Sequence, residues 1–105
     1  VRRRMVSLTE VKELLRIPYD DEDSFIQAII DAGYIYLENA VEDYHELYES
    51  NESFSRLADY FVKTQWCPTA FDDREGMLAG SVQLSYTARS IITQLQLYTY
   101  TEGGE

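Results

Sequence analysis

The chain has 105 residues, of which 19 are acidic and nine are basic, so its formal net charge is -10. This length fits one domain with a single modest core, and a hydrophobic fraction of 45% is ordinary for a folded globule. The charge argues against free nucleic acid and anionic membranes as partners, because both are negatively charged. The single cysteine, Cys67, allows no internal disulfide, and no apolar run reaches the ~18 residues that a transmembrane helix needs.

The first helix is predicted over residues 9–17. Ser7 and Glu10 have the spacing of a capping box and can start the helix, and Thr9 is the alternative helix start. Apolar residues then fall on one face of the helix and charged residues on the other. Pro18 is expected to end the helix, because the residue before a proline is disfavoured in the helical conformation.

Four consecutive acids follow, and we expect them to cap and charge-complement the next helix: Asp20, Asp21, Glu22 and Asp23. A calcium site is the alternative, but the glycine turn and the distant glutamate of a calcium loop are absent. The next helix is predicted to be the longest, over residues 23–48, because apolar residues recur at steps of three and four. Gly33 within it costs ~1 kcal/mol relative to alanine. We interpret this glycine as a place where another helix approaches closely.

Two further helices are predicted in the second half of the chain. Ser53 is expected to cap a third helix, which has apolar residues along one face. The Cys67-Pro68 pair is expected to end this helix. Residues 69–80 are the least regular stretch. A fourth helix then runs from residue 81 or 85 to residue 97, with an apolar stripe at helical spacing.

Two groups of residues are candidate interface contacts. The irregular stretch holds a charged cluster that we interpret as local ion pairs and as a candidate contact between subunits, namely Asp72, Asp73, Arg74 and Glu75. The chain also has nine tyrosines, too many for a core of this size, and exposed aromatic residues mark interfaces. Tyr98 and Tyr100 complete the candidate interface.

The predicted fold is all-α, a small bundle of four to five helices, since helices joined by short loops pack antiparallel. We expect a single helical domain over residues 1–98, in which residues 1–4 are an N-terminal extension before a fold that begins near Met5. Residues 99–105 are expected to be a flexible polar tail, because they are polar, glycine-containing and terminal.

No residue makes a positive case for catalysis or for a cofactor. His45 has no second ligand at metal-site spacing, and we expect it on a helix surface or half-buried. Cys67 lies near a helix C-terminus, where the helix dipole disfavours a thiolate, so we expect a packed thiol. Glycine-rich phosphate loops, serine–histidine–aspartate arrangements and zinc patterns are absent from the sequence. The prediction is therefore a non-enzymatic protein without metal or cofactor.

The order of these segments resembles the head–tail connector proteins of tailed bacteriophages. The opening residues 5–17 (MVSLTEVKELLRI) and the block 19–32 (YDDEDSFIQAIIDA) look like the family's first helix, acidic turn and second helix. The third helix, ending at Trp66, and the closing segment 84–96 (LSYTARSIITQLQ) are similar to the family's later helices. Gln96 follows the "QL" pair where the family often has arginine.

The resemblance implies a structural head-completion or adaptor subunit, of the kind often labelled as DNA packaging. Such proteins form a ring of about twelve copies beneath the portal protein. The ring extends the DNA channel, through which DNA passes without specific binding, and provides the platform for a stopper or tail-completion protein and then the tail. The expected location is the head–tail joint of the virion, after assembly in the cytoplasm of the bacterial host, with no membrane involved.

Two other classes of protein remain as alternatives. The first is a small acidic binding module, either a DNA-mimic inhibitor or an adaptor of a host protein, which would present regularly spaced carboxylates to a basic cleft. The second is an enzyme with a carboxylate or tyrosine site, which would need a pocket around His45 or Asp72. A portal ring or a basic enzyme as partner separates the connector from the inhibitor.

Overall fold

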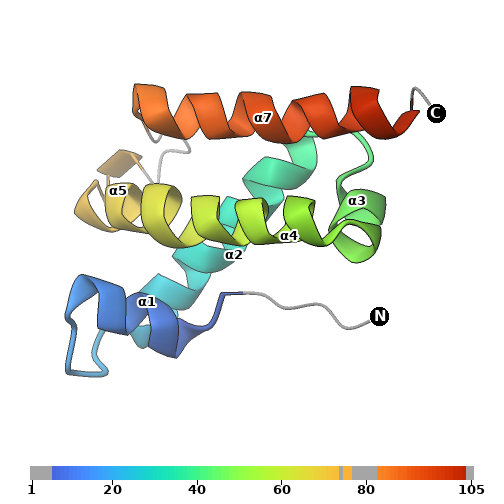
Figure 1. Ribbon diagram of the computed structural model, residues 1–105. Helices are drawn as coiled ribbons and strands as arrows, with labels where there is room; N and C mark the ends of the chain where they lie inside the picture. Colours follow the sequence, from blue (N-terminus) through green and yellow to red (C-terminus); the bar gives the residue numbers. More distant parts are fainter. Residues whose placement is uncertain (1–5, 74, 77–82, 104–105) are drawn as a thin grey trace.

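The computed structural model describes residues 6–73, 75–76 and 83–103 (Figure 1). Within these residues the regular elements are helices, and the expected small all-α bundle is confirmed. None of the helices in this part of the chain has the length and hydrophobicity to cross a bilayer. The elements in chain order are α1 (Leu8–Leu15), α2 (Asp23–Ala40), α3 (Tyr44–Ser50), α4 (Glu52–Tyr60), the π-helix η1 (Phe61–Trp66), α5 (Cys67–Asp72) and α7 (Tyr86–Gly103).

Helix α1 begins with the predicted capping box. The Ser7 hydroxyl accepts a hydrogen bond from the Glu10 amide at 3.1 Å, and the Glu10 carboxylate accepts one from the Ser7 amide at 2.9 Å. The helix ends earlier than expected, because Arg16 adopts the left-handed conformation with φ of 61°. The amides of Arg16 and Ile17 then bond back to carbonyls of the last turn, so Pro18 follows a helix that has already ended.

The acids after α1 do not cap α2 through their side chains, which corrects the expected capping, whereas Asp23 in the first turn of α2 confirms the expected charge complementation. Glu22 occupies the N-cap position without a side-chain hydrogen bond. Instead the Lys12 ammonium lies 2.7 Å from a carboxylate oxygen of Asp20 and 2.7 Å from one of Asp23. These hydrogen bonds, first to Asp20 and then to Asp23, raise the pKa of Lys12. The acidic turn is thus tied to α1 by a lysine that faces it.

The predicted helix over residues 23–48 is two helices. Val41 is extended and Asp43 is left-handed with φ of 61°, so the chain turns sharply between α2 and α3. Aspartate tolerates this conformation better than most residues. The turn brings Val41, Tyr44 and Leu47 into the same core, with exposed fractions of 2%, 6% and 4%. Val41, Tyr44 and Leu47 keep a helical spacing of three residues across the turn, so helical periodicity alone did not reveal the break.

Helix α4 also differs from its prediction at both ends. Asn51, rather than Ser53, is the cap, and its side chain accepts a hydrogen bond from the Phe54 amide at 3.1 Å. The chain does not stop at Pro68 but continues through η1 into α5. In η1 the helix widens, so that the Cys67 amide bonds to the Val62 carbonyl five residues back. Pro68 then lies in the first turn of α5, where a proline is tolerated.

Helix α2 and η1 approach each other closely at Gly33 and Trp66. A Cβ atom on Gly33 would lie 2.8 Å from the Trp66 Cδ1 atom, so only glycine leaves room for the indole. The Trp66 Nε1 atom donates to the Ile29 carbonyl of α2 at 2.9 Å. The expectation of a close approach at Gly33 is therefore confirmed. Around this contact lie the fully buried Val11, Ile26, Ile30, Leu37, Phe54, Phe61 and Leu95.

Helix α7 runs along the bundle beside α4, in the opposite direction (Figure 1). Its predicted apolar stripe is confirmed, with Ala88, Ile91, Ile92 and Leu95 buried. The helical backbone continues to Gly103, so the expected helix end at Leu97 is wrong. The Gln96 side chain donates to the Ala40 carbonyl at 2.9 Å and satisfies one of the backbone acceptors left open at the C-terminus of α2. The division into a domain ending at residue 98 and a mobile tail stays a prediction.

Candidate functional site

The charged loop predicted as an interface is only partly described. Asp72 is the exposed last residue of α5, and Glu75 is exposed. Asp73 stabilises the turn, since its Oδ1 atom accepts a hydrogen bond from the Gly76 amide at 2.9 Å. Arg74, the cation of the predicted cluster, lies outside the described residues, so the role of this loop as a contact stays a prediction.

The two C-terminal tyrosines of the candidate interface have different positions. Tyr98 is half-buried and packs edge-on against Phe54, with ring centroids 5.5 Å apart. The Tyr98 ring therefore packs α7 against α4. Tyr100 continues the helical backbone of α7, and its side chain lies outside the described part of the chain.

Three tyrosines are buried, and two of them share a carboxylate. Tyr34 of α2 and Tyr48 of α3 both donate to Asp59 Oδ1 of α4, each at 2.6 Å. The Tyr34 hydroxyl also accepts a hydrogen bond from the Val6 amide at 3.0 Å. Burial, and then the bond to Asp59, raises the pKa of Tyr34 well above its ordinary value. This network joins three helices and the segment before α1, so it has a structural role.

Neither of the two residues weighed for catalysis is placed for it. His45 is a surface histidine whose Nε2 atom lies 3.2 Å from Glu38, and its side chain is 62% exposed. Cys67 is fully buried, and burial raises the pKa of its thiol to about 12, so it stays protonated near neutral pH. Among the described residues no three histidine, cysteine or acidic side chains group as metal ligands would.

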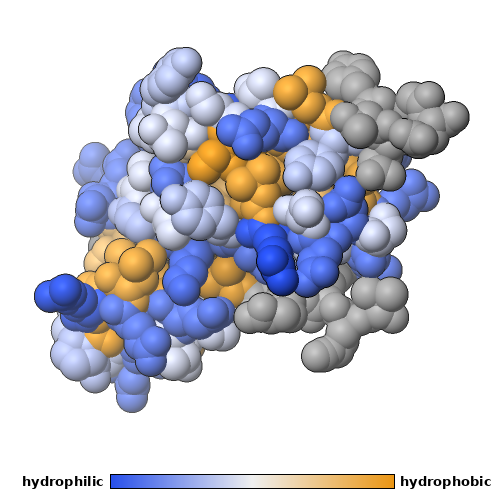
Figure 2. Space-filling model, viewed as in Figure 1, coloured by the Kyte–Doolittle hydropathy of each residue, from blue (hydrophilic) through white to orange (hydrophobic). Residues whose placement is uncertain are grey.

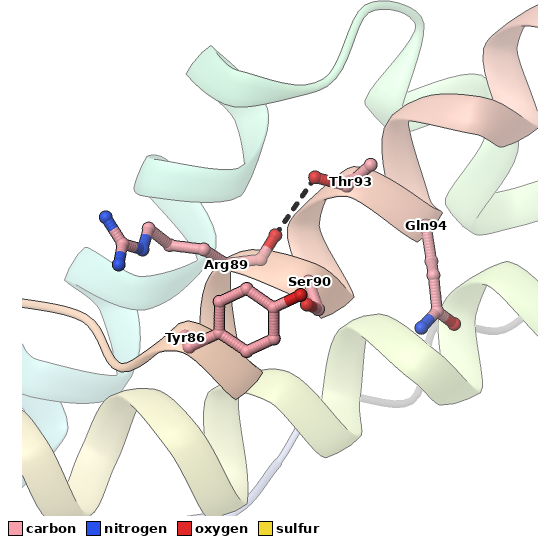
Figure 3. A pocket seen from close by; sticks show the side chains of 5 residues that line it. All are labelled: Tyr86, Arg89, Ser90, Thr93 and Gln94. Atoms are coloured by element: carbon pink, nitrogen blue, oxygen red, sulfur yellow. Dashed lines mark hydrogen bonds between the residues drawn. The ribbon is translucent and has the colours of Figure 1, made fainter.

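A hollow of about 600 Å³ lies on the outer side of α7, opposite its buried stripe (Figure 3). Its lining comes from this one helix, namely Tyr86, Arg89, Ser90, Thr93 and Gln94. It is open to solvent, with polar groups and one exposed ring at its edge, which suits a contact with a macromolecule better than an enclosed small-molecule site. Tyr86 is 79% exposed and Leu97, further along the same face, is 53% exposed.

Charge divides the molecule into two regions. Residues 6–52 contain 13 acidic and two basic residues, whereas residues 76–101 contain no acid and one cation, Arg89. The total charge of -10 conceals this contrast. The signal was present in the sequence, because the acid-free stretch coincides with the last predicted helix, and its polar stripe has helical spacing.

A family model described as phage gp6-like head-tail connector protein matches residues 5–100. No curated protein matches the chain, and no solved structure matches it. The matched residues include every helix from α1 to α5 and most of α7.

Proposed function

The chain belongs to the family of phage gp6-like head–tail connector proteins, and from this premise we propose that copies of it form a ring beneath the phage portal. The ring, of about twelve copies, extends the DNA channel and gives the stopper and the tail their platform. The family is structural, so the chain is a structural connector protein of the junction between phage head and tail. The observation that carries the proposal is the family match along nearly the whole chain.

The fold supports a structural rather than a catalytic role. Polar groups inside the fold join helices, since Tyr34 of α2 and Tyr48 of α3 both donate to the carboxylate of Asp59 on α4. The exposed tyrosines are spread over the fold instead of around one pocket, with Tyr19 in the turn before α2 and Tyr60 on α4 each 51% exposed. Such amphipathic rings suit contacts with protein neighbours, which in the proposed ring are other copies, the portal protein and the stopper.

The acidic character has a use in this assembly. Residues 38–52 contain six acids and no lysine or arginine, and both Asp43 and Glu46 are exposed. In the proposed ring this stretch faces the channel, where repulsion of phosphates lets DNA slide without binding. Replacing Asp43 and Glu46 by lysine should therefore slow DNA ejection from particles. Unchanged ejection would exclude this role for the acids.

The connector role is tested by deleting the gene from its phage or prophage and imaging the particles by negative stain. We expect heads without tails, filled with DNA or leaking it, alongside free tails. A plasmid-borne copy should restore joined particles that contain the protein. Intact infectious particles from the deletion would overturn the proposal and favour the acidic binding module, whose partner would then be a basic protein.

A further inference from the structure

Two surfaces on opposite sides of the molecule have features that fit each other. The first, the α7 outer face, consists of Tyr86, Arg89, Ser90, Thr93, Gln94 and Leu97. The second, the α1 edge, consists of Leu14, Tyr19, Asp20 and Asp21. In Figure 1 α7 and α1 lie on opposite sides of the α4–α5 layer. Helix α1 packs on α2, whereas α7 packs on α4, η1 and α2, so neither surface covers the other within one copy.

Both surfaces expose large apolar side chains. Leu14 and Tyr19 on the α1 edge are 43% and 51% exposed, and Tyr86 and Leu97 on the α7 outer face are 79% and 53% exposed. These four are the majority of the seven large hydrophobic residues exposed in the described chain. Figure 2 shows hydrophobic side chains exposed over α1 at the lower left, bordered by hydrophilic ones. Exposed apolar side chains bordered by polar ones are typical of protein contacts.

The two surfaces carry opposite charge. Arg89 is exposed on a helix face that has no acid, whereas Asp21 is exposed and the Asp20 side chain is 86% exposed. Two copies with a net charge of -10 each repel one another in most orientations. An acidic copy can approach the α7 outer face without meeting like charge from the residues that form this face. Charge complementarity therefore selects the α1 edge of another copy as the occupant of the α7 outer face.

We propose that the α7 outer face of one copy docks on the α1 edge of the next copy, with Arg89 beside Asp20 and Asp21. This inference rests on the proposed ring and assigns the contact that builds it. A contact between two different surfaces of the same chain is head-to-tail, and it closes into a ring when the rotation between copies closes. Surfaces on opposite sides of the subunit suit a ring of many copies, because successive subunits then turn through a small angle.

Cross-linking between unlike cysteine variants tests the contact directly. Gln94→Cys places a thiol on the α7 outer face, and Asp21→Cys places one on the α1 edge. The native Cys67 is buried with a raised thiol pKa, so the wild-type chain is the control for background reaction. With a short bismaleimide, a mixture of the two variants should give linked dimers, and the doubly substituted chain should give a ladder. Neither variant alone should cross-link.

The outcomes separate the possible occupants of the α7 outer face. Linked dimers from Gln94→Cys alone would overturn the proposal in favour of a two-fold pair of α7 helices. A link from Gln94→Cys to another phage protein, without links between copies, would overturn it in favour of that protein. The reaction is run on the purified chain and on phage particles that contain it, and absence of the mixed link from both also overturns it. Particles without the protein would instead contradict the proposed function.

Charge reversal provides the second test. Arg89→Glu should raise the concentration needed for self-association about tenfold or more, measured by sedimentation velocity at low salt. Adding Asp21→Arg in the same chain should restore it, since every contact regains one opposite pair. Arg56→Glu makes the same charge change on α4, where Arg56 pairs with Glu52, and should have little effect. Failure of Asp21→Arg to rescue Arg89→Glu would exclude the α1 edge as the counter-surface.

Discussion

Tyrosine side chains have one role in the interior around α2 and the opposite role on the α7 outer face. At the α2 junction, where α2 packs on α3 and η1, the hydroxyls of Tyr34 and Tyr48 donate to Asp59 of α4, and the Trp66 indole donates to a backbone carbonyl of α2. On the α7 outer face Tyr86 is 79% exposed beside polar side chains that line an open hollow. One residue type therefore stabilises the fold in one region and is available to partners in the other. Substitutions at the two places should therefore change different measurements.

The largest effect is expected at Asp59. Asp59→Ala leaves the hydroxyls of Tyr34 and Tyr48 without their shared acceptor, which should lower the free energy of unfolding by about 2–4 kcal/mol. Urea denaturation followed by circular dichroism measures it. Asp59→Asn is the matched control, because it keeps a side-chain oxygen at this position and should cost less. Equal losses in the two variants would show that charge, not acceptance, is what the junction needs.

The Tyr34 hydroxyl should matter more than that of Tyr48. Tyr34→Phe removes a donor to Asp59 and the acceptor of the Val6 amide, which should cost about 1–3 kcal/mol. Tyr48→Phe removes a donor to Asp59, and about 1 kcal/mol is expected. Hydrogen exchange at the Val6 amide should accelerate in Tyr34→Phe but not in Tyr48→Phe. If the Val6 amide exchanges equally in both, the segment before α1 is not held by Tyr34.

A methyl group at Gly33 should destabilise the junction despite its benefit to helix propensity. Gly33→Ala gains ~1 kcal/mol of helix propensity, but its Cβ would lie 2.8 Å from Trp66 Cδ1. Overpacking costs about 1–3 kcal/mol, so we expect a net loss of up to about 2 kcal/mol. Ala28→Gly, at an exposed position of the same helix, calibrates the propensity term. A Gly33→Ala chain more stable than wild type would mean that the indole shifts without cost.

Alkaline pH should weaken the interior selectively. Burial raises the pKa of Tyr34 from its ordinary value of 10.0, and it raises the pKa of Cys67 from 9.0 to about 12. The unfolded chain therefore releases protons above about pH 9 that the folded chain retains, so stability is present below that pH and falls as pH rises. Each group contributes up to about 1.4 kcal/mol per pH unit. Urea titrations from neutral to alkaline pH should show a shallower decline in Tyr34→Phe and in Cys67→Ala, and unchanged slopes would contradict the burial of these groups.

The smallest effect on folding is expected at Tyr86. Tyr86→Ala should change the free energy of unfolding by less than ~0.5 kcal/mol, because the side chain is exposed. The same substitution should weaken self-association, measured by sedimentation velocity, because it removes an apolar ring from the proposed contact. A large loss of stability with unchanged association would reverse the assignment of the two regions.

Several local features followed from the sequence because their causes are local. The capping box of Ser7 and Glu10 involves residues three apart, and the buried stripe on α7 follows from helical spacing. The all-helical class likewise follows from apolar residues at steps of three and four. Gly33 was correctly interpreted as a close approach, although nothing in the sequence identified Trp66, 33 positions later, as the side chain that fills the space.

The errors have a common origin in long-range packing. The break at residues 41–43 arises because the core accommodates Tyr44 and Leu47 only if the chain turns. The helix continues past Pro68 because η1 widens before it. The acids before α2 were wrongly expected to cap it: Asp20 and Asp23 contact Lys12 of α1, each at 2.7 Å, and Glu22 at the N-cap position makes no capping hydrogen bond with its side chain. In each case a preference of neighbouring residues was overridden by contacts made elsewhere.

The sequence by itself determined the helical class, the charge contrast between residues 6–52 and residues 76–101, and the resemblance to the connector family that the family match confirmed. These properties depend on residue composition, spacing and order, which are fixed in the chain before it folds. Only the tertiary structure decided which tyrosines are buried around Asp59 and which are exposed, and that the α1 edge and the α7 outer face lie on opposite sides of the molecule. Those facts depend on how helices distant in the sequence pack, because burial and relative position are properties of the assembled core and not of any single helix.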